Sequence, residues 1–260
     1  MRKEYLNFID STVFEGMTSI RAILRAHDAK INDRKIKQIL FDKSNVKKIG
    51  KELGYLRAVS DKYEFELLES SKEEIEEIAL GNTHGGLIAI CESRSIPSLC
   101  PEILKENSFY VMIQGIEDPY NFGYAIRSLY AAGVEGVILD ERNWMSAAGV
   151  VARSSAGASE ELPMYTSDAS LAVDIFKSKG YDVVCADLNT ELVLGECEMK
   201  YPIFLIVGGE RRGISRDILQ KVDKKVKIEY AREFRASLSA ASATTMFAYE
   251  IMRQNKKHGF

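Results

Sequence analysis

The distribution of apolar and polar positions along the chain predicts an α/β protein. In the C-terminal half, short apolar runs are separated by segments of helical or mixed periodicity. These runs are Phe109–Ile113, Gly136–Leu139, Asp182–Ala186 and Ile203–Val207. Such alternation is typical of a mainly parallel sheet that is covered by helices on both faces. A final helix rich in small residues is predicted at Ser237–Arg253.

The N-terminal part has the pattern of a second, smaller α/β unit. Its predicted helices are Ser19–His27, Val46–Arg57 and Lys72–Leu80, and its predicted strands are Lys37–Phe41, Tyr63–Leu68 and Leu87–Cys91. Ser71 and Glu74 have the spacing of a capping box at the start of the third helix. The following stretch contains Pro97 and Pro101 and has no clear periodicity, which indicates a domain boundary. We therefore expect a domain at 1–95, a linker at 96–107 and a second domain at 108–260.

Composition limits the class of protein. A chain of 260 residues with 46% hydrophobic residues can bury one large core or two moderate ones. No run approaches the roughly 18 apolar residues that a membrane helix needs, and the N-terminus is too polar for a signal peptide, so we expect a cytoplasmic protein. Four cysteines without a CxxC pair and three scattered histidines predict no metal site.

Charge is unevenly distributed along the chain. A net charge of -3 argues against uniform binding to a polyanion, but the region from Arg21 to Lys62 holds twelve basic and five acidic residues. A second basic cluster runs from Arg211 to Arg235. A solvated face would explain either cluster alone, whereas two clusters in one chain favour a phosphate-rich partner.

Three loops that follow predicted strands carry groups suited to ligand binding. Ile116–Gly133 has Asn121 near a helix start and Arg127 two turns further on. The stretch VGGERRGIS from Val207 combines three glycines with Glu210, and glycines let a backbone approach a ligand closely. The third loop, FRASLSAAS, places Ser237 and Ser239 at a helix start, where backbone N–H groups are free.

Taken singly, each feature has a simpler explanation. Asn121 and Ser237 could be N-caps, Arg127 a surface residue and Gly213 a turn glycine. GGERRG matches neither GxGxxG nor a loop ending in GK[ST]. The residues alone thus predict an α/β domain with a ligand site at the ends of its strands.

Together, the three loops resemble the motifs of the SpoU (TrmH-type) RNA ribose methyltransferases of the SPOUT superfamily. Ile116–Gly133 resembles the first motif, VGGERRGIS the second and Ile228–Ala243 the third, and RSSAGASEELP at Arg153 is similar to a segment between them. The third motif departs from the family pattern, because Glu229 replaces a proline, the spacing is one residue longer and Ser239 replaces an asparagine of longer reach.

The resemblance extends to the first domain. GMTSIRAIL near Gly16 and GNTHGGLIAI at Gly81 resemble the start and end of the substrate-binding domain often attached to this family, which has a ribosomal-protein-like RNA-binding fold. The residues expected to bind RNA are Arg21, Arg25, Lys35, Lys47, Lys48, Lys51 and Arg153.

The resemblance implies methyl transfer from S-adenosyl-L-methionine to a ribose 2'-hydroxyl, in a homodimer whose C-terminal domain contains a trefoil knot. The implied cofactor residues are Val207, Gly208, Gly209, Gly213, Ile228, Ser237, Leu238 and Ala243. Asn121, Arg127, Glu210 and Ser237 are the implied catalytic residues that surround the acceptor. An arginine pKa above about 12 makes Arg127 a poor base, so we expect it to bind an RNA phosphate or stabilise the developing alkoxide.

The expected substrate is ribosomal RNA rather than transfer RNA, given the basic first domain. Two alternatives stay open. One is a non-catalytic RNA-binding or ribosome-assembly protein that retains the fold, and the other is an enzyme that methylates a base nitrogen of guanine in RNA.

Overall fold

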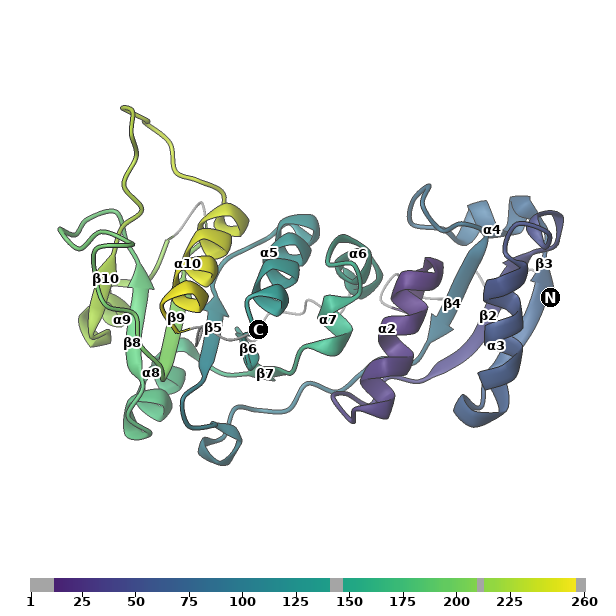
Figure 1. Cartoon of the computed structure of the whole chain (residues 1–260), viewed down its shortest axis with the longest axis horizontal. Coiled ribbons are helices and arrows are strands. Elements are labelled where there is room, and N and C mark those ends of the chain that lie inside the picture. The colour runs from purple at the N-terminus through teal and green to yellow at the C-terminus, as the bar shows by residue number, and fades with distance from the viewer. Residues whose placement is uncertain (1–11, 141–146, 210–212, 256–260) are drawn as a thin grey trace. The chain divides into compact units, whose positions relative to one another are not determined.

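The computed structural model describes residues 12–140, 147–209 and 213–255. The chain divides into two compact units (Figure 1). Unit 1 is formed by residues 1–95 and 143–161, and unit 2 by residues 96–142 and 162–260. Among the described residues, the chain thus returns to unit 1 at 147–161, a segment that the sequence-based division leaves within 108–260.

Unit 1 is built on a four-stranded sheet in the order β1-β4-β2-β3. The strands are β1 (Val13–Glu15), β2 (Ile36–Asp42), β3 (Glu66–Ser70) and β4 (Leu87–Cys91). Strand β4 is antiparallel to β1 and β2, whereas β2 and β3 are parallel. Its helices are α2 (Gly16–Asp28), α3 (Gly50–Tyr63), α4 (Lys72–Ile78), α6 (Ala148–Ser154) and α7 (Ala158–Glu161).

Alternation along β2 divides the core of unit 1 into two layers. Ile39 and Phe41 pack in the larger cluster with residues of α2, α3 and α6. Leu40, which points to the other face, packs with Ile75 of α4 in a smaller cluster. This follows from the two-residue period of a strand. Helices therefore cover both faces of the sheet.

Local signals set the boundaries of these elements. The capping box of Ser71 and Glu74 is present as predicted. The helix predicted at Val46–Arg57 begins instead at Gly50, after a 3-10 turn at Lys43–Asn45 that the Asp42 side chain caps. Because α3 runs on to Tyr63, the next strand starts later than predicted, at Glu66.

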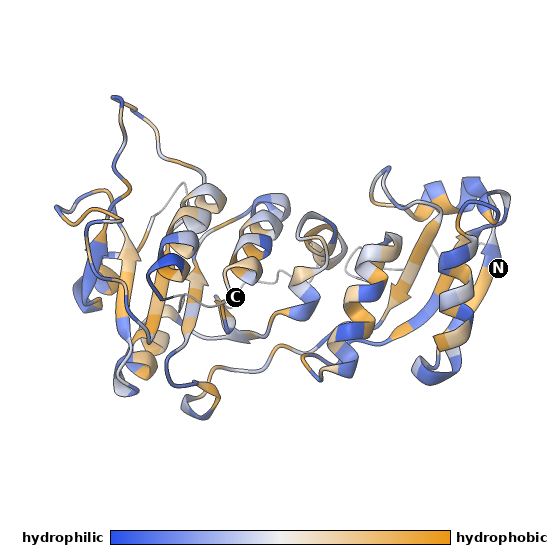
Figure 2. Ribbon diagram, in the orientation of Figure 1, coloured by the Kyte–Doolittle hydropathy of each residue, from blue (hydrophilic) through white to orange (hydrophobic). Residues whose placement is uncertain are grey.

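Unit 2 is built on a six-stranded parallel sheet in the order β10-β8-β9-β5-β6-β7. The strands are β5 (Phe109–Ile113), β6 (Gly136–Leu139), β7 (Met164–Thr166), β8 (Asp182–Ala186), β9 (Ile203–Val207) and β10 (Lys224–Val226). Every neighbouring pair is parallel. The four strands predicted from apolar runs have the observed bounds. Figure 2 shows the central strands as continuous apolar segments, as expected for strands buried on both faces.

The helices of unit 2 cover both faces of this sheet (Figure 1). They are α5 (Pro119–Ala131), α8 (Ala169–Ser178), α9 (Arg216–Lys221) and α10 (Ala240–Asn255), and a 3-10 turn lies at Pro101–Ile103. Phe176 of α8 stacks on Phe204 of β9 within the core on one side. On α5 and α10, the hydroxyls of Ser128 and Thr245 form a 2.8 Å hydrogen bond, so these two helices lie side by side.

The predicted parallel sheet with helices on both faces is confirmed. The trefoil knot implied by the family resemblance stays a prediction. Among the helices that the structure describes, none is long and apolar enough to cross a bilayer.

Candidate cofactor cavity and acceptor helix

A cavity of about 350 Å³ opens at the carboxyl ends of β8, β9 and β10 in unit 2. The carboxyl edge of a parallel sheet is where α/β proteins usually bind ligands, and the volume lies in the range of small-molecule sites. Residues at the ends of these three strands and in the segments that follow them line the cavity, together with residues of α9 and α10. They are Ala186, Asp187, Leu188, Asn189, Val207, Gly208, Gly209, Gly213, Ile214, Leu219, Val226, Lys227, Ile228, Tyr230, Ser237, Leu238, Ala240, Ala243 and Phe247.

The glycines after β9 are required by close backbone approach. A Cβ atom on Gly209 would lie 2.4 Å from the carbonyl oxygen of Gly115, and one on Gly208 would lie 2.7 Å from the carbonyl carbon of Gly213. Gly213 has a φ of +61°, and its N–H donates to the Gly209 carbonyl at 3.0 Å. Gly213 is therefore a turn glycine, which is the simpler of the two explanations given for it from the sequence. It also lines the cavity.

The segment between β10 and α10 closes the cavity on another side. The N–H of Leu238 donates to the Tyr230 hydroxyl at 3.2 Å, which ties the two ends of this segment together. Helix α10 begins at Ala240, later than predicted, because the Ser239 hydroxyl accepts from the N–H of Ser242 at 3.1 Å in the manner of an N-cap. Ser237 is thus not the cap of this helix.

The structure brings together all eight residues that the sequence assigns to cofactor binding. Each of them lines the cavity, namely Val207, Gly208, Gly209, Gly213, Ile228, Ser237, Leu238 and Ala243. Their role in binding a cofactor stays a prediction. Glu210, expected beside the acceptor, lies outside the described residues.

Helix α5 presents the other two residues expected at the acceptor. Asp118, followed by Pro119, caps this helix and accepts from the N–H groups of Tyr120 and Asn121. The explanation of Asn121 as an N-cap is therefore wrong. Asn121 is half-buried and Arg127 is exposed. Neither is among the described residues that line the cavity.

The approach of Gly115 to Gly209 nevertheless joins the first predicted loop to the second. Both loops leave adjacent strands, since β5 pairs with β9. The start of α5 therefore follows directly from a loop that touches the wall of the cavity.

Sequence reasoning missed the segment that follows β8. Asp187, Leu188 and Asn189 line the cavity, and the Asp187 carboxylate accepts from the N–H of Asn189 at 3.0 Å. The apolar run at 182–186 predicts a strand, and the rule that ligands bind at the carboxyl ends of strands singles out the polar residues after it. Lys227 and Tyr230, beside β10, had no such signal.

In unit 1, six of the seven residues expected to bind RNA are exposed, and Arg153 is half-buried. The exposed residues are Arg25 and five others, Arg21, Lys35, Lys47, Lys48 and Lys51. The Arg21 guanidinium lies 5.4 Å from the ring centroid of Tyr55, so a cation and an aromatic side chain share that surface.

Two of the seven form ion pairs within unit 1. Arg25 donates to both carboxylate oxygens of Glu161, at 3.0 and 2.5 Å. Arg153 donates to the buried carboxylate of Glu15 at 2.8 Å, and that carboxylate also accepts from the N–H of Gly81. Both arginines hold α6 and α7 on unit 1, and their contact with RNA stays a prediction.

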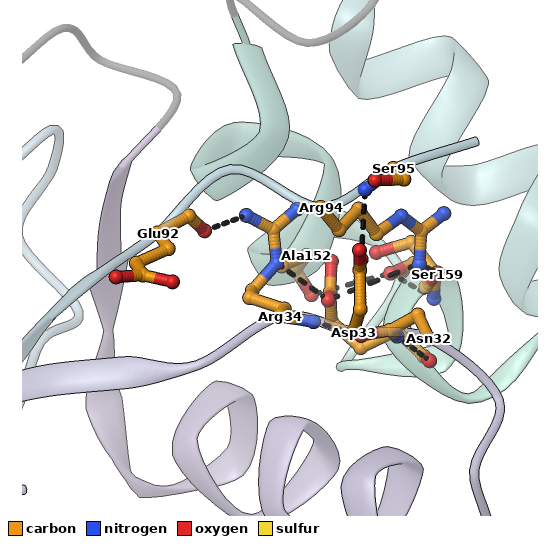
Figure 3. A network of polar contacts seen from close by, with 10 residues as sticks. Asn32, Asp33, Arg34, Glu92, Arg94, Ser95, Ala152 and Ser159 are labelled. Carbon is orange, nitrogen blue, oxygen red and sulfur yellow. Dashed lines mark hydrogen bonds and ion pairs between the residues drawn. The ribbon is translucent and has the colours of Figure 1, made fainter.

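A buried cluster of polar groups also attaches α7 to the rest of unit 1 (Figure 3). Glu160 accepts from the Arg34 Nε at 2.8 Å, and the Arg94 Nη1 lies 3.9 Å from the same carboxylate. Arg94 also donates to the carbonyl of Ser159 at 2.9 Å. Burial lowers the pKa of the Arg94 guanidinium, and the Glu160 charge opposes that shift.

Burial raises the pKa of three of the cysteine thiols. The pKa of Cys185 is raised to about 12, and those of Cys91 and Cys197 are also raised. All four cysteines are free thiols. Within residues 12–140, 147–209 and 213–255, no group of three His, Cys, Asp or Glu side chains is placed to hold a metal ion.

Relatives place the sequence in a family. Residues 108–249 match the SpoU rRNA Methylase family. A protein of Staphylococcus haemolyticus named for the TrmH family of tRNA/rRNA methyltransferases is 31% identical over 153 residues, which cover 58% of this chain and 61% of that protein. The match thus spans less than two thirds of the relative.

Solved structures have the same fold. An RNA 2'-O ribose methyltransferase superposes with a TM-score of 0.75 at 22% identity, covering 93% of this chain and 88% of that one. The SpoU methyltransferase AviRb from Streptomyces viridochromogenes, in complex with the cofactor AdoMet, has a TM-score of 0.74 at 22% identity and covers 93% and 89%. The match of residues 108–249 extends over more than half of the sequence, and this chain therefore belongs to the SpoU rRNA Methylase family.

Proposed function

We propose that this protein transfers a methyl group from S-adenosyl-L-methionine to a ribose 2'-hydroxyl of RNA, with ribosomal RNA as the substrate. One observation carries the proposal. Three segments far apart in the sequence, which resemble the family's motifs, lie at the carboxyl edge of one sheet. The second and third line a single cavity, and Gly115, directly before the first, approaches Gly209 of the second.

The lining of the cavity fits S-adenosylmethionine. Apolar walls from Val226, Ile228 and Phe247 suit the flat adenine ring, and the glycine loop offers backbone groups that no side chain screens. Asp187 and Lys227 supply opposite charges, which suit ribose hydroxyls and a carboxylate. When bound, the sulfonium supplies an already activated methyl group.

The protein's own task is then to align the acceptor and to favour loss of its proton. We assign Asn121 and Arg127 of α5 to the RNA side of the site. A guanidinium stays protonated at neutral pH, so Arg127 would bind a phosphate or stabilise the alkoxide that develops on the 2'-oxygen. Ser237, exposed at the rim of the cavity, would lie between the two sides.

Nucleoside mapping tests this function. The protein is incubated with labelled S-adenosylmethionine and total RNA, and the RNA is digested to nucleosides. We expect label on 2'-O-methylated nucleosides. Label on guanine would replace the ribose reading with base methylation, and cofactor binding without transfer would favour the non-catalytic alternative.

Replacing Arg127 by Ala separates its role from cofactor binding. Because Arg127 is exposed and does not line the cavity, R127A should abolish transfer and leave the affinity for S-adenosylmethionine nearly unchanged. Full activity of R127A would refute the assignment. Lys179, a cation of unit 2 at the end of α8, provides the control K179A, which should retain activity.

We also propose that the protein is a cytoplasmic homodimer. An exposed apolar surface on α5 and α10 supports the dimer. Tyr124 lies one turn before Ser128, Tyr249 lies one turn after Thr245, and both rings are exposed. Light scattering at micromolar concentration should give twice the chain mass, and the variant Y124D/Y249D should be monomeric. A monomeric wild-type protein would contradict this proposal.

A further inference from the structure

The segment at residues 229–237, here called the arm, is the part of the third motif that departs most from the family pattern. In Figure 1 it is the yellow-green loop that runs between β10 and α10 and extends away from both. Residues 231–237 are all exposed. The segments at its two ends nevertheless line the cavity, through Ile228 and Tyr230 on one side and Ser237 and Leu238 on the other.

Phe234 occupies the exposed part of the arm with its ring in a defined place. Phe234 is 54% exposed, and the centroid of its ring lies 5.8 Å from that of Tyr230 at an interplanar angle of 68°. Tyr230 in turn accepts the N–H of Leu238, which closes the base of the arm. An apolar ring that is about half exposed is therefore held against Tyr230, which lines the cavity.

We propose that Phe234 is a stacking platform for an unpaired nucleobase of the substrate RNA, adjacent to the nucleotide whose ribose enters the site. This inference rests on the proposed function for its substrate class. An exposed aromatic ring is a sequence-tolerant surface for bases, and proteins bind single-stranded RNA by such rings combined with arginines.

The neighbours of Phe234 favour RNA over a protein partner. Arg232 and Arg235 flank the ring in the sequence, and the Arg235 guanidinium is exposed, paired only loosely with Glu233 at 3.5 Å. Guanidinium groups of residues close in the sequence to an aromatic ring can bind the phosphates next to a stacked base. A purely apolar protein contact would not require these charges.

Binding of a single-stranded oligonucleotide tests the platform without requiring turnover. The probe is a fluorescein-labelled 12-nucleotide oligoadenylate, and the measurement is fluorescence anisotropy with the full-length chain. F234A should raise the Kd about 5- to 150-fold, the equivalent of about 1–3 kcal/mol for one stacked base. F234L should weaken binding similarly, because leucine has no aromatic face, and F234W should retain it.

A matched control and two further measurements make the outcome specific. L192A removes another exposed apolar side chain of unit 2, 44% exposed and outside the cavity lining, and should leave the Kd unchanged. F234A should keep the affinity for S-adenosylmethionine, since Phe234 does not line the cavity. It should also keep the molar mass of the wild type in light scattering.

Several results would overturn the inference. Equal RNA affinity of F234A and the wild type would overturn it. So would an F234A variant that loses affinity for S-adenosylmethionine but not for RNA. Loss of the dimer in F234A would also overturn it, because it would indicate that Phe234 contacts protein. Failure of the proposed function would give a different result from failure of the stacking platform. If the wild type transfers no methyl group but oligoadenylate binding still depends on an aromatic ring at 234, the platform stands and the catalytic proposal fails.

Discussion

Replacing Glu160 by Ala should destabilise unit 1 strongly, because it removes the carboxylate from a buried cluster of two arginines. The Glu160 side chain is 2% exposed, that of Arg34 is 1% exposed, and that of Arg94 is also buried. Removing one partner of a buried ion pair costs about 3–5 kcal/mol, since the remaining charge stays buried without compensation. That is a large fraction of the roughly 5–15 kcal/mol that stabilises a typical domain.

Glu161 provides a control from the same helix. It pairs with Arg25 through two hydrogen bonds, but the Arg25 side chain is 56% exposed. The Glu161 side chain is 15% exposed, but the Arg25 charge stays in contact with solvent when Glu161 is removed, so the pair contributes about 0–1 kcal/mol and E161A should have a small effect. The contrast between two adjacent glutamates therefore isolates burial as the cause of the loss.

Hydrogen exchange is the suitable measurement, because a protein of two units need not unfold in a single transition. Amides of α2 and of α6, both in unit 1, should exchange faster in E160A by about two to three and a half orders of magnitude, the equivalent of 3–5 kcal/mol at 1.4 kcal/mol per factor of ten. Amides of the central strands of unit 2 should change much less. A loss below about 1 kcal/mol, equal to the expected effect of E161A, would refute this reasoning.

Three further predictions concern thiols, acid and the third motif. Cys91 and Cys185, whose thiol pKa values burial raises, should resist iodoacetamide at pH 8 in the folded protein; rapid alkylation of both would contradict their burial. Hydrogen bonds from Arg253 lower the pKa of Glu250 below its ordinary 4.5, so its stabilising effect is present above pH 4.5 and is lost as the pH falls through the lower folded value. E250Q should therefore flatten the fall of the melting temperature below pH 4.5, and an unchanged slope would count against the pair. S239A should lose about 1 kcal/mol of stability through loss of a helix cap, whereas S239N should keep it; equal losses in thermal melts would exclude a capping role.

The four central strands of the unit 2 sheet could be predicted closely from the sequence, whereas the short edge strands β7 and β10 were not predicted. The central strands are buried on both faces, so each reads as an unbroken apolar run such as Phe109–Ile113 and Ile203–Val207, and the structure has the same bounds. The capping box at Ser71 was equally clear, because both partners lie within four residues. Boundaries shifted where a longer helix displaced the next element, as α3 did by extending to Tyr63.

The attachment of residues 147–161 to unit 1 could not be predicted. It depends on pairs such as Arg34 with Glu160, which are 126 positions apart. Periodicity and capping report interactions within a few residues, so they carry no information about which distant charge a buried guanidinium meets. Arg153 looked like one more basic residue for the same reason, although it pairs with Glu15.

The residues of the candidate site likewise fall into those that the sequence could predict and those that it could not. The glycine loop at Gly208 and Gly209 was visible because close backbone approach leaves a composition signal. Asp187 lines the same cavity, and its only signal is its place after a predicted strand, whereas Tyr230 carries no signal, since a single tyrosine is common. The strand order places β8 and β10 next to each other, and this brings Asp187 and Tyr230 to the same cavity.

Titration of S-adenosylmethionine into wild type and G209A tests the central claim, that the cavity of unit 2 holds this cofactor. A Cβ atom on Gly209 would lie 2.4 Å from the Gly115 carbonyl oxygen, so the two loops must separate. In the free variant the loops relax apart, and cofactor binding must restore the strained arrangement at a cost of about 1–3 kcal/mol, so G209A should bind about 5- to 150-fold more weakly. G54A, where an added Cβ meets nothing within 4 Å, should bind like the wild type. Wild-type affinity in a folded G209A, or no binding by the wild type, would contradict the claim.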